Sequence, residues 1–293
     1  MNNIFKSIIR ILFYKDAYGI AFKNQMDTSF HVVYPTNRFS YADPFVFEYN
    51  GKTAIFVELM DKKYGWGTIG TFEIKDGAIQ PFKEIIREKN HMSFPNVFIH
   101  NNTVYMIPET YGANNVHMYR CIDFPYLWEK TDSLIDEVRL VDHSLVELDN
   151  ETYIVTYDLD INSSRCFIMN WKSLKLEEIY PKGEFCKERP GGTFFCENGV
   201  LKRVIQDCKK TYGDFLKIFS VYQLNKDVFE ETKDKEIRVE DLKFDVSEKF
   251  EHIHQYSKSE VYEAIDFRYE KFYFNKLFWF LYRLLFHHNR DFK

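Results

Sequence analysis

The 293-residue sequence lacks the features that mark several classes of protein. Its five cysteines are odd in number and show no paired Cys-x-x-Cys spacing, which argues against a disulfide framework or a zinc site. We therefore expect reduced thiols in the core of a cytoplasmic protein. No secretory signal is recognised near the start, and no segment reaches the roughly 20 apolar residues that a spanning helix needs. Lys and Arg number 39 against 44 Asp and Glu, and this acidic balance argues against nucleic acid as a partner.

The sequence is rich in aromatic residues, at 18%, and in strand-turn-strand patterns. The clearest pattern occupies residues 41–58, where two strand-like runs flank Asn50-Gly51. An Asn-Gly pair between such runs is typical of a tight β-hairpin. The hairpin brings its first and last residues side by side, so Asp43 and Glu58 are predicted to share one rim.

Four further copies of this pattern follow, and the fifth is the weakest. They occupy residues 93–109, 142–158, 189–207 and 252–266. Further strand-like runs lie between them, at 67–74, 84–87, 116–120, 165–170 and 216–222. A repeat of about 50 residues built of strands predicts a propeller. We predict an all-β fold, a five-bladed β-propeller over residues 20–270; a β-sandwich with coincidental hairpins is the alternative.

The two ends of the chain have a different pattern. Residues 1–19 and 271–293 carry apolar residues at helical spacing with basic residues around them. We predict a short amphipathic helix at each terminus. Basic amphipathic helices are suited to an anionic membrane surface, although packing on the propeller or on a partner protein explains the pattern equally well.

The propeller arrangement predicts a functional site. If the first strand of each hairpin is innermost, the residues that open these strands gather at one mouth of a central funnel. They are Asp43, Ser93, Asp142, Arg189 and His252 or His254, and the returning strands add Glu58, Glu109, Asp158, Asp207 and Asp266 behind them. A charged concave site of this kind binds small polar ligands. For any single residue, capping a strand end in water is the simpler explanation, and the recurrence at one register favours a site.

Several nearby residues are candidate ligand contacts. Arg189 precedes Pro190-Gly191-Gly192, where the backbone can approach a ligand closely and the guanidinium can grip a phosphate or carboxylate. Arg38 and His91 lead into the first two hairpins. Gln206, Asp207 and Tyr212 follow Arg189 in the fourth hairpin. For each of them the structural alternative is a surface salt bridge or a packed residue.

The motifs resemble a known family. They are Tyr41-Ala42-Asp43-Pro44-Phe45 with Glu58, His91-Met92-Ser93-Phe94-Pro95 with Ile107-Pro108-Glu109, Phe124-Pro125 with Trp128, Arg189-Pro190-Gly191-Gly192, and Gln206-Asp207 through Tyr212-Gly213. In this order they resemble the amino-terminal domain of plant glucosamine inositolphosphorylceramide transferase and its bacterial relatives, over about residues 20–270. The resemblance implies a five-bladed propeller and a role in building glycans. The plant protein also carries a separate transferase domain, which lies outside the resemblance.

The predicted fold also resembles the five-bladed glycoside hydrolases of family 43. In that family an aspartate before a proline on the first inner strand serves as base, and Asp43-Pro44 matches it. The resemblance implies a second aspartate and an acidic glutamate on other blades, for which Asp142 and Glu109 are the candidates.

These observations lead to three hypotheses. The first is a sugar transferase of surface polysaccharide or glycolipid assembly, with Asp43, Glu109 and Asp142 as catalytic carboxyl groups acting on a sugar, in nucleotide-activated form, at the inner membrane face. The contacts expected for its substrate are Arg38, Glu58, His91, Arg189, Gln206, Asp207, Tyr212 and His254. The second is a glycoside hydrolase, and the third is a glycan-binding module that serves a partner transferase. No cofactor or metal ion is predicted.

Overall fold

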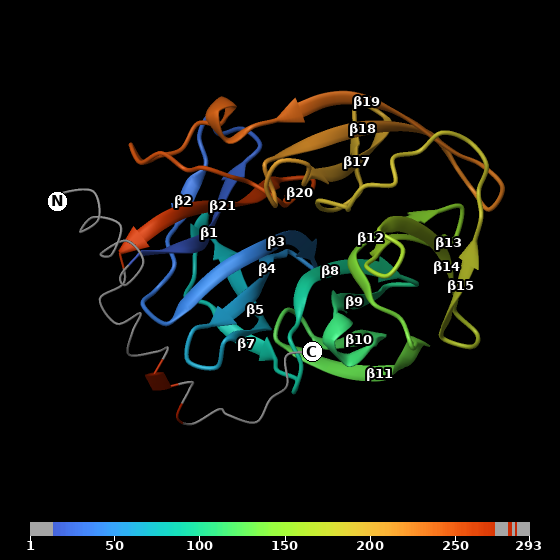
Figure 1. The fold of residues 1–293 in the computed structure, drawn as a ribbon, viewed down its shortest axis with the longest axis horizontal. Coiled ribbons are helices and arrows are strands. Elements are labelled where there is room, and N and C mark those ends of the chain that lie inside the picture. Colours follow the sequence, from blue (N-terminus) through green and yellow to red (C-terminus); the bar gives the residue numbers. More distant parts are fainter. Residues whose placement is uncertain (1–13, 273–280, 283–284, 286–293) are drawn as a thin grey trace.

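The protein is built of five antiparallel sheets arranged around a common axis (Figure 1). The computed structural model describes residues 14–272, 281, 282 and 285. The first three blades follow the chain in order. Blade 1 contains β3 (Phe39–Tyr49), β4 (Lys52–Asp61) and β5 (Trp66–Lys75), with β6 (Ala78–Ile79) and β7 (Lys83–Ile86) both paired to β5. Blade 2 contains β8 (Ser93–His100), β9 (Thr103–Glu109), β10 (Asn115–Asp123) and β11 (Leu127–Asp136), with a short 3-10 helix at Tyr111–Ala113. Blade 3 contains β12 (Leu140–Leu148), β13 (Glu151–Asp158), β14 (Ser163–Asn170) and β15 (Lys175–Ile179).

The last two blades complete the ring. Blade 4 contains β16 (Phe195–Glu197), β17 (Val200–Asp207), β18 (Phe215–Leu224) and β19 (Phe229–Ile237), followed by a 3-10 helix at Val239–Asp241. Blade 5 contains β20 (Tyr256–Lys258), β21 (Tyr262–Phe272), β1 (Tyr14–Asn24) and β2 (His31–Val33). The prediction of a five-bladed β-propeller is therefore confirmed.

The hairpin turns explain why the repeat is visible in the sequence. Each of the first four blades joins its inner two strands through a pair of residues with positive φ, which such a tight turn requires. The pairs are Asn50-Gly51, Asn101-Asn102, Asp149-Asn150 and Asn198-Gly199. Asn, Asp and Gly adopt this conformation most readily, so the turns leave a local signature that can be read without the structure.

The ring is closed by a strand from the start of the chain. β1 pairs with β21 over its whole length, from Tyr14 opposite Phe272 to Asn24 opposite Tyr262. Strand structure thus begins at Tyr14, within the segment 1–19 that the sequence analysis had set apart from the propeller. The predicted terminal helices lie outside the described residues, except for Leu281, Tyr282 and Leu285, which are helical.

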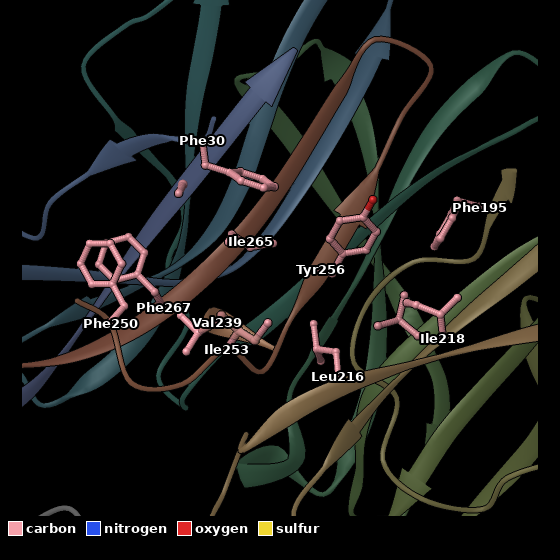
Figure 2. Close-up of a cluster of buried hydrophobic side chains, with 12 residues drawn as sticks. Phe30, Phe195, Leu216, Ile218, Val239, Phe250, Ile253, Tyr256, Ile265 and Phe267 are labelled. Atoms are coloured by element: carbon pink, nitrogen blue, oxygen red, sulfur yellow. The ribbon is translucent and has the colours of Figure 1, made fainter. Parts of the chain in front are cut away.

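Aromatic side chains fill the space between neighbouring blades. The cluster between blades 4 and 5, shown in Figure 2, contains Phe250 and Phe267, with ring centroids 3.9 Å apart, and Phe195 and Tyr256, 5.6 Å apart. Such pairs add about 0.5–1.5 kcal/mol each beyond the area that they bury. Part of the aromatic content seen in the sequence therefore serves the packing between blades.

The cysteines only partly match their prediction. All five are free thiols, and Cys166 is buried. Cys196 and Cys208 are exposed, so the expectation that all five lie in the core was wrong. Within the described residues, no helix is long and apolar enough to cross a membrane.

Candidate functional site

A β-bulge occurs at the same place in the innermost strand of blades 1, 2 and 3. The strand registers shift between Ala42 and Phe45, between Ser93 and Asn96, and between Val141 and Ser144. Within these bulges Asp43, Phe94 and Asp142 have φ of 49°, 46° and 55°. Left-handed backbone at a residue other than glycine costs about 1–3 kcal/mol and is concentrated at functional sites.

The bulges connect neighbouring blades through buried hydrogen bonds. Each displaced backbone N–H donates to a side-chain carboxyl oxygen of the preceding blade. The bonds run from Asp43 to Oδ2 of Asp266 at 3.2 Å, from Phe94 to Oδ2 of Asp43 at 3.0 Å, and from Asp142 to Oε2 of Glu109 at 3.4 Å. These acidic residues therefore hold the inner strands of neighbouring blades together.

The funnel contains a cavity of about 380 Å³. Most of the residues selected from the sequence line it, namely Asp43, Glu58, His91, Glu109, Asp142, Arg189, Tyr212 and His254. Tyr18, Ser40, Met60 and Lys62 also line it and were not selected. Tyr18 was missed because it lies on β1, whose place in blade 5 depends on a pairing between the two ends of the chain.

Two glutamic acids occupy equivalent places on blades 1 and 2. Glu58 lies opposite Ala42, and Glu109 lies opposite Ser93. Burial, reinforced by the charge of Asp142, raises the pKa of Glu109 to about 8. Burial and the charge of Asp43 raise the pKa of Glu58 well above its usual value. Glu109 is therefore protonated near neutral pH and can donate a hydrogen bond or a proton, and the same burial favours the protonated form of Glu58.

His91 supports Glu58. Its Nδ1 accepts a hydrogen bond from the backbone N–H of Gly67 at 2.9 Å, so the proton of the neutral ring is on Nε2, 3.4 Å from Oε1 of Glu58. Burial lowers the pKa of His91, which favours this neutral form. Gly67 leaves the necessary space, because a Cβ there would lie 2.6 Å from the same Glu58 oxygen.

Asp142 organises the opposite wall. Its Oδ2 accepts hydrogen bonds from Nε of Arg189 at 2.5 Å and from Nε2 of Gln206 at 3.2 Å. Burial alone would lower the pKa of Arg189, but the charge of Asp142 raises it, so the guanidinium stays charged. Gln206 also donates to the carbonyl of Pro190 at 2.8 Å. It therefore lies behind the cavity and positions Asp142.

His254 lies between two carboxylates. Its Nε2 is 3.0 Å from Oδ1 of Asp43, and its Nδ1 is 2.9 Å from Oδ2 of Asp266. Ligating atoms of these three residues lie within 4.8 Å of one another, close enough to share a metal ion. Both ring nitrogens are already bonded to carboxylates, so a metal ion would have to displace one of these bonds. The three residues form a hydrogen-bonded set.

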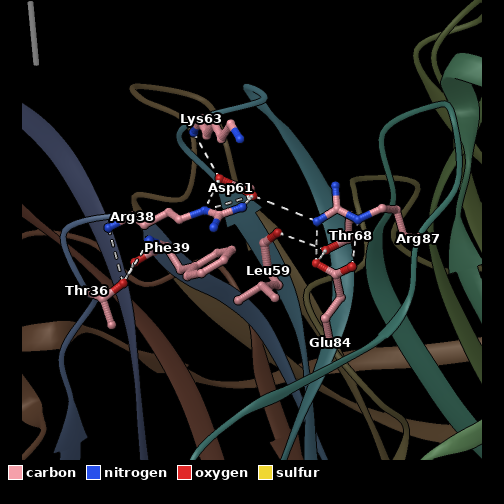
Figure 3. A network of polar contacts seen from close by, with 9 residues as sticks. All are labelled: Thr36, Arg38, Phe39, Leu59, Asp61, Lys63, Thr68, Glu84 and Arg87. Carbon is pink, nitrogen blue, oxygen red and sulfur yellow. Dashed lines mark hydrogen bonds and ion pairs between the residues drawn. The ribbon is translucent and has the colours of Figure 1, made fainter. Parts of the chain in front are cut away.

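Besides Gln206, two of the selected residues do not line the cavity, namely Arg38 and Asp207. Arg38 forms a bidentate pair with the fully buried Asp61, with its Nη2 2.7 Å from Oδ2 (Figure 3). Asp207 is bonded to Lys217 at 2.6 Å. Arg38 and Asp207 were predicted to contact a ligand, but each forms a salt bridge in this structure.

Comparison with known proteins places the chain in a family. Residues 27–254 match the model described as "Glucosamine inositolphosphorylceramide transferase 1, N-terminal". The chain belongs to this family. Similar curated proteins are named glucosamine inositolphosphorylceramide transferase 1. The relative from Oryza sativa subsp. indica is 32% identical over 211 residues, which are 68% of this chain and 28% of the relative. The relative from Arabidopsis thaliana is 30% identical over 205 residues, which are 66% of this chain and 27% of the relative. The chain thus spans just over a quarter of these relatives of the glucosamine inositolphosphorylceramide transferase family.

Two solved structures with the same fold are named for enzymes that act on glycosides. A β-xylosidase, RS223, superposes with a TM-score of 0.55 and 9% identity, over 80% of this chain and 92% of the other. An α-L-arabinofuranosidase from Podospora anserina gives 0.56 and 10%, over 78% and 90%. At this identity the likeness concerns the fold, and it agrees with the five-bladed architecture seen in Figure 1.

Proposed function

We propose that the cavity binds a sugar and that the protein is a sugar transferase in the assembly of a surface polysaccharide or glycolipid. One observation carries the proposal. The same cavity holds a carboxylate with both oxygens hydrogen-bonded, Asp43, and a buried carboxylic acid with a pKa of about 8, Glu109. Reactions at glycosidic bonds commonly use one ionised and one protonated carboxyl group.

The proposed roles follow from these protonation states. Asp43 accepts the proton of the acceptor hydroxyl as its oxygen bonds to the sugar carbon, or stabilises positive charge on that carbon. Glu109 gives its proton to the leaving oxygen as the bond from the sugar to that oxygen breaks. Asp142 holds Arg189, whose guanidinium lines the cavity and is suited to a phosphate or carboxylate of the substrate.

The substrate class is proposed from the family and the cavity together. The relatives' name refers to glucosamine and to a phosphorylated inositol lipid. Hydroxyl and amino groups of a sugar fit a wall formed by Glu58 and Glu109, and a nucleotide-activated sugar would present its phosphate to Arg189. His91 is already engaged with Gly67 and Glu58, so we assign it the positioning of Glu58 and not the binding of an anion.

We also propose that the funnel works beside a membrane at the inner face. Lys62 lines the cavity, and the adjacent Lys63 has its ammonium 5.6 Å from the ring centroid of Tyr282 in the carboxy-terminal segment. Leu281 and Leu285, one helical turn apart, are 44% and 70% exposed. Exposed leucines in a segment with basic residues suit an anionic lipid surface.

The second candidate is a glycan-binding module that serves a separate transferase. It is favoured by the coverage, because the matched part is only 28% of the length of the rice relative. Under this function the same cavity would bind the sugar without changing it.

The test is a transfer assay on the full chain. Purified protein is incubated with a panel of nucleotide sugars and sugar or inositol acceptors, and products are identified by mass spectrometry. The proposal expects a glycosylated acceptor that D43N and E109Q do not form. D158N is the control, because Asp158 is buried and bonded to Arg165 at 2.7 Å outside the cavity. Release of free sugar to water would favour the hydrolase, and saturable binding without turnover would favour the binding module.

A further inference from the structure

Asp266 is a buried acidic residue on β21 that does not line the cavity. Its side chain is 0% exposed, and its carboxylate contacts Asp43, His254 and Gln255. Its Oδ1 accepts the backbone N–H groups of His254 at 2.9 Å and Gln255 at 3.1 Å. Its Oδ2 accepts from the backbone N–H of Asp43 at 3.2 Å and faces Nδ1 of His254 at 2.9 Å. Two backbone segments and one side chain are thus fixed by a single carboxylate.

The bonds among Asp266, His254 and Asp43 form a closed cycle. The Asp43 backbone and the His254 ring both donate to Asp266, and the other ring nitrogen donates to Oδ1 of Asp43 at 3.0 Å. An ionised carboxylate can only accept, so both nitrogens of His254 must carry protons for both bonds to form. When both carboxyl groups are ionised, the contacts are those of an imidazolium between two carboxylates.

The His254 ring is buried and packs against two tyrosines. Tyr18 on β1 meets it edge-on, with ring centroids 5.5 Å apart, and the ring centroid of Tyr212 lies 5.1 Å from that of His254. Tyr212 can come this close because the next residue, Gly213, has φ of +64° and a Cβ there would lie 2.4 Å from Cβ of His254. These contacts favour the orientation in which Nε2 faces Asp43.

We propose that Asp266 is a positioning residue that acts through His254, and that the two together fix the Asp43 carboxylate for its work in the cavity. Oδ2 of Asp43 is held by the Phe94 N–H and Oδ1 by His254, so neither oxygen is free to rotate. The unit unites blades 1 and 5, and it exists only once the ring has closed. This proposal rests on the proposed function in one respect, which is that Asp43 is taken as the carboxylate that acts on the substrate.

The electrostatic surroundings agree with this geometry. Burial alone would lower the pKa of His254, but the charge of Asp266 and the hydrogen bonds to Asp266 and Asp43 raise it well above its usual value. The titratable groups that act on His254 come from every neighbouring element. They are Tyr18 on β1, Asp43 on β3, Glu58 on β4, Asp142 on β12, Asp266 on β21, and Cys208 and Tyr212 after β17.

The test is the protonation of His254 in the full chain, measured through the ring nitrogen shifts of ¹⁵N-labelled protein and assigned by loss of the signals in H254Q. In the wild type we expect both nitrogens to be protonated at about pH 8, above the usual titration of histidine near 6.5. In D266N we expect the midpoint to fall by about 1–3 pH units, since one opposite charge is removed. D266E, which restores the charge, should recover part of the shift.

D61N is the matched control. Asp61 is equally buried and paired with Arg38, so D61N should lower stability and leave the His254 titration unchanged. A neutral His254 in the wild type at about pH 8, or an unchanged titration in folded D266N, would overturn the proposal. If D266N does not fold, the proposal is tested by comparing the wild type with D266E. The longer side chain of glutamate should shift the midpoint of the His254 titration, and an unchanged midpoint would overturn the proposal. The titration needs no substrate, so its outcome is independent of the transfer assay. If the transfer assay fails and His254 titrates as expected, the proposed function is wrong and the proposed role of Asp266 is still supported.

Discussion

Nε of Arg189 lies 2.5 Å from Oδ2 of Asp142, across the boundary between blades 4 and 3. R189Q would leave Asp142 buried without its counter-charge, and we expect a loss of about 3 kcal/mol in the free energy of unfolding. Urea denaturation measures it. R139Q is the control, because Arg139 and Asp160 form an exposed pair at 3.0 Å, of a kind that contributes about 0–1 kcal/mol. If both variants lose the same free energy of unfolding, the buried pair of Arg189 and Asp142 contributes no more to stability than the exposed pair.

The pKa of Glu109 predicts how stability changes with pH. It is about 8 in the folded protein against a usual value of 4.5, so the folded state binds the proton more tightly than the unfolded state. The stabilisation is complete below the unfolded value and is lost as pH rises towards the folded one. The free energy of unfolding should therefore fall between these two pH values. E109Q should reduce this slope by up to about 1.4 kcal/mol per pH unit, and an unchanged slope would show that Glu109 does not titrate there.

Two glycines on β5 offer a direct comparison of packing beside the cavity. A Cβ on Gly67 would lie 2.5 Å from the carbonyl oxygen of Met92 and 2.6 Å from Oε1 of Glu58, whereas the nearest atom to a Cβ on Gly70 is 3.4 Å away. We expect G67A to cost about 1–3 kcal/mol and to displace Glu58, with G70A close to neutral. Thermal denaturation of both variants checks this, and a tolerated G67A would contradict the packing described for Glu58.

Vesicle binding tests the proposed membrane contact. Full-length protein should sediment with phosphatidylcholine vesicles that contain phosphatidylglycerol, and less with phosphatidylcholine alone, because the terminal segments are basic. The double variant in which Leu281 and Leu285 are both replaced by glutamate should bind the vesicles less. Leu127→Glu is the control, since Leu127 is 55% exposed on β11. Equal binding of both variants would exclude these leucines as the contact.

The sequence predicted the parts of the fold that depend on local signals. The turns at Asn50-Gly51 and its counterparts require positive φ, which few residue types adopt, so the hairpins and their repeat were recognisable. The residues that open and close each hairpin follow from strand pairing alone, and this is why Asp43, Glu58, Glu109 and Asp142 were found together.

The remaining features depend on contacts between distant parts of the chain. Tyr18 reaches the cavity only because β1 pairs with β21, and the register of that pairing leaves no local signal. Arg38 precedes the first hairpin by the right distance, but Asp61 binds it away from the cavity. Asp266 was expected behind the rim, yet its contacts with both His254 and the Asp43 backbone exist only in the closed ring.

The most direct test of the central claim is the surface-glycan profile of cells in three states: wild type, deletion, and D43N with the protein confirmed to be folded. Asparagine keeps the shape of Asp43 and tolerates its φ of 49°, so the variant removes the charge with little change of backbone. The account predicts that the deletion and D43N lose the same glycan feature. If the deletion loses it and D43N retains it, the carboxylate of Asp43 is not needed, and the account of the cavity as a catalytic site is contradicted.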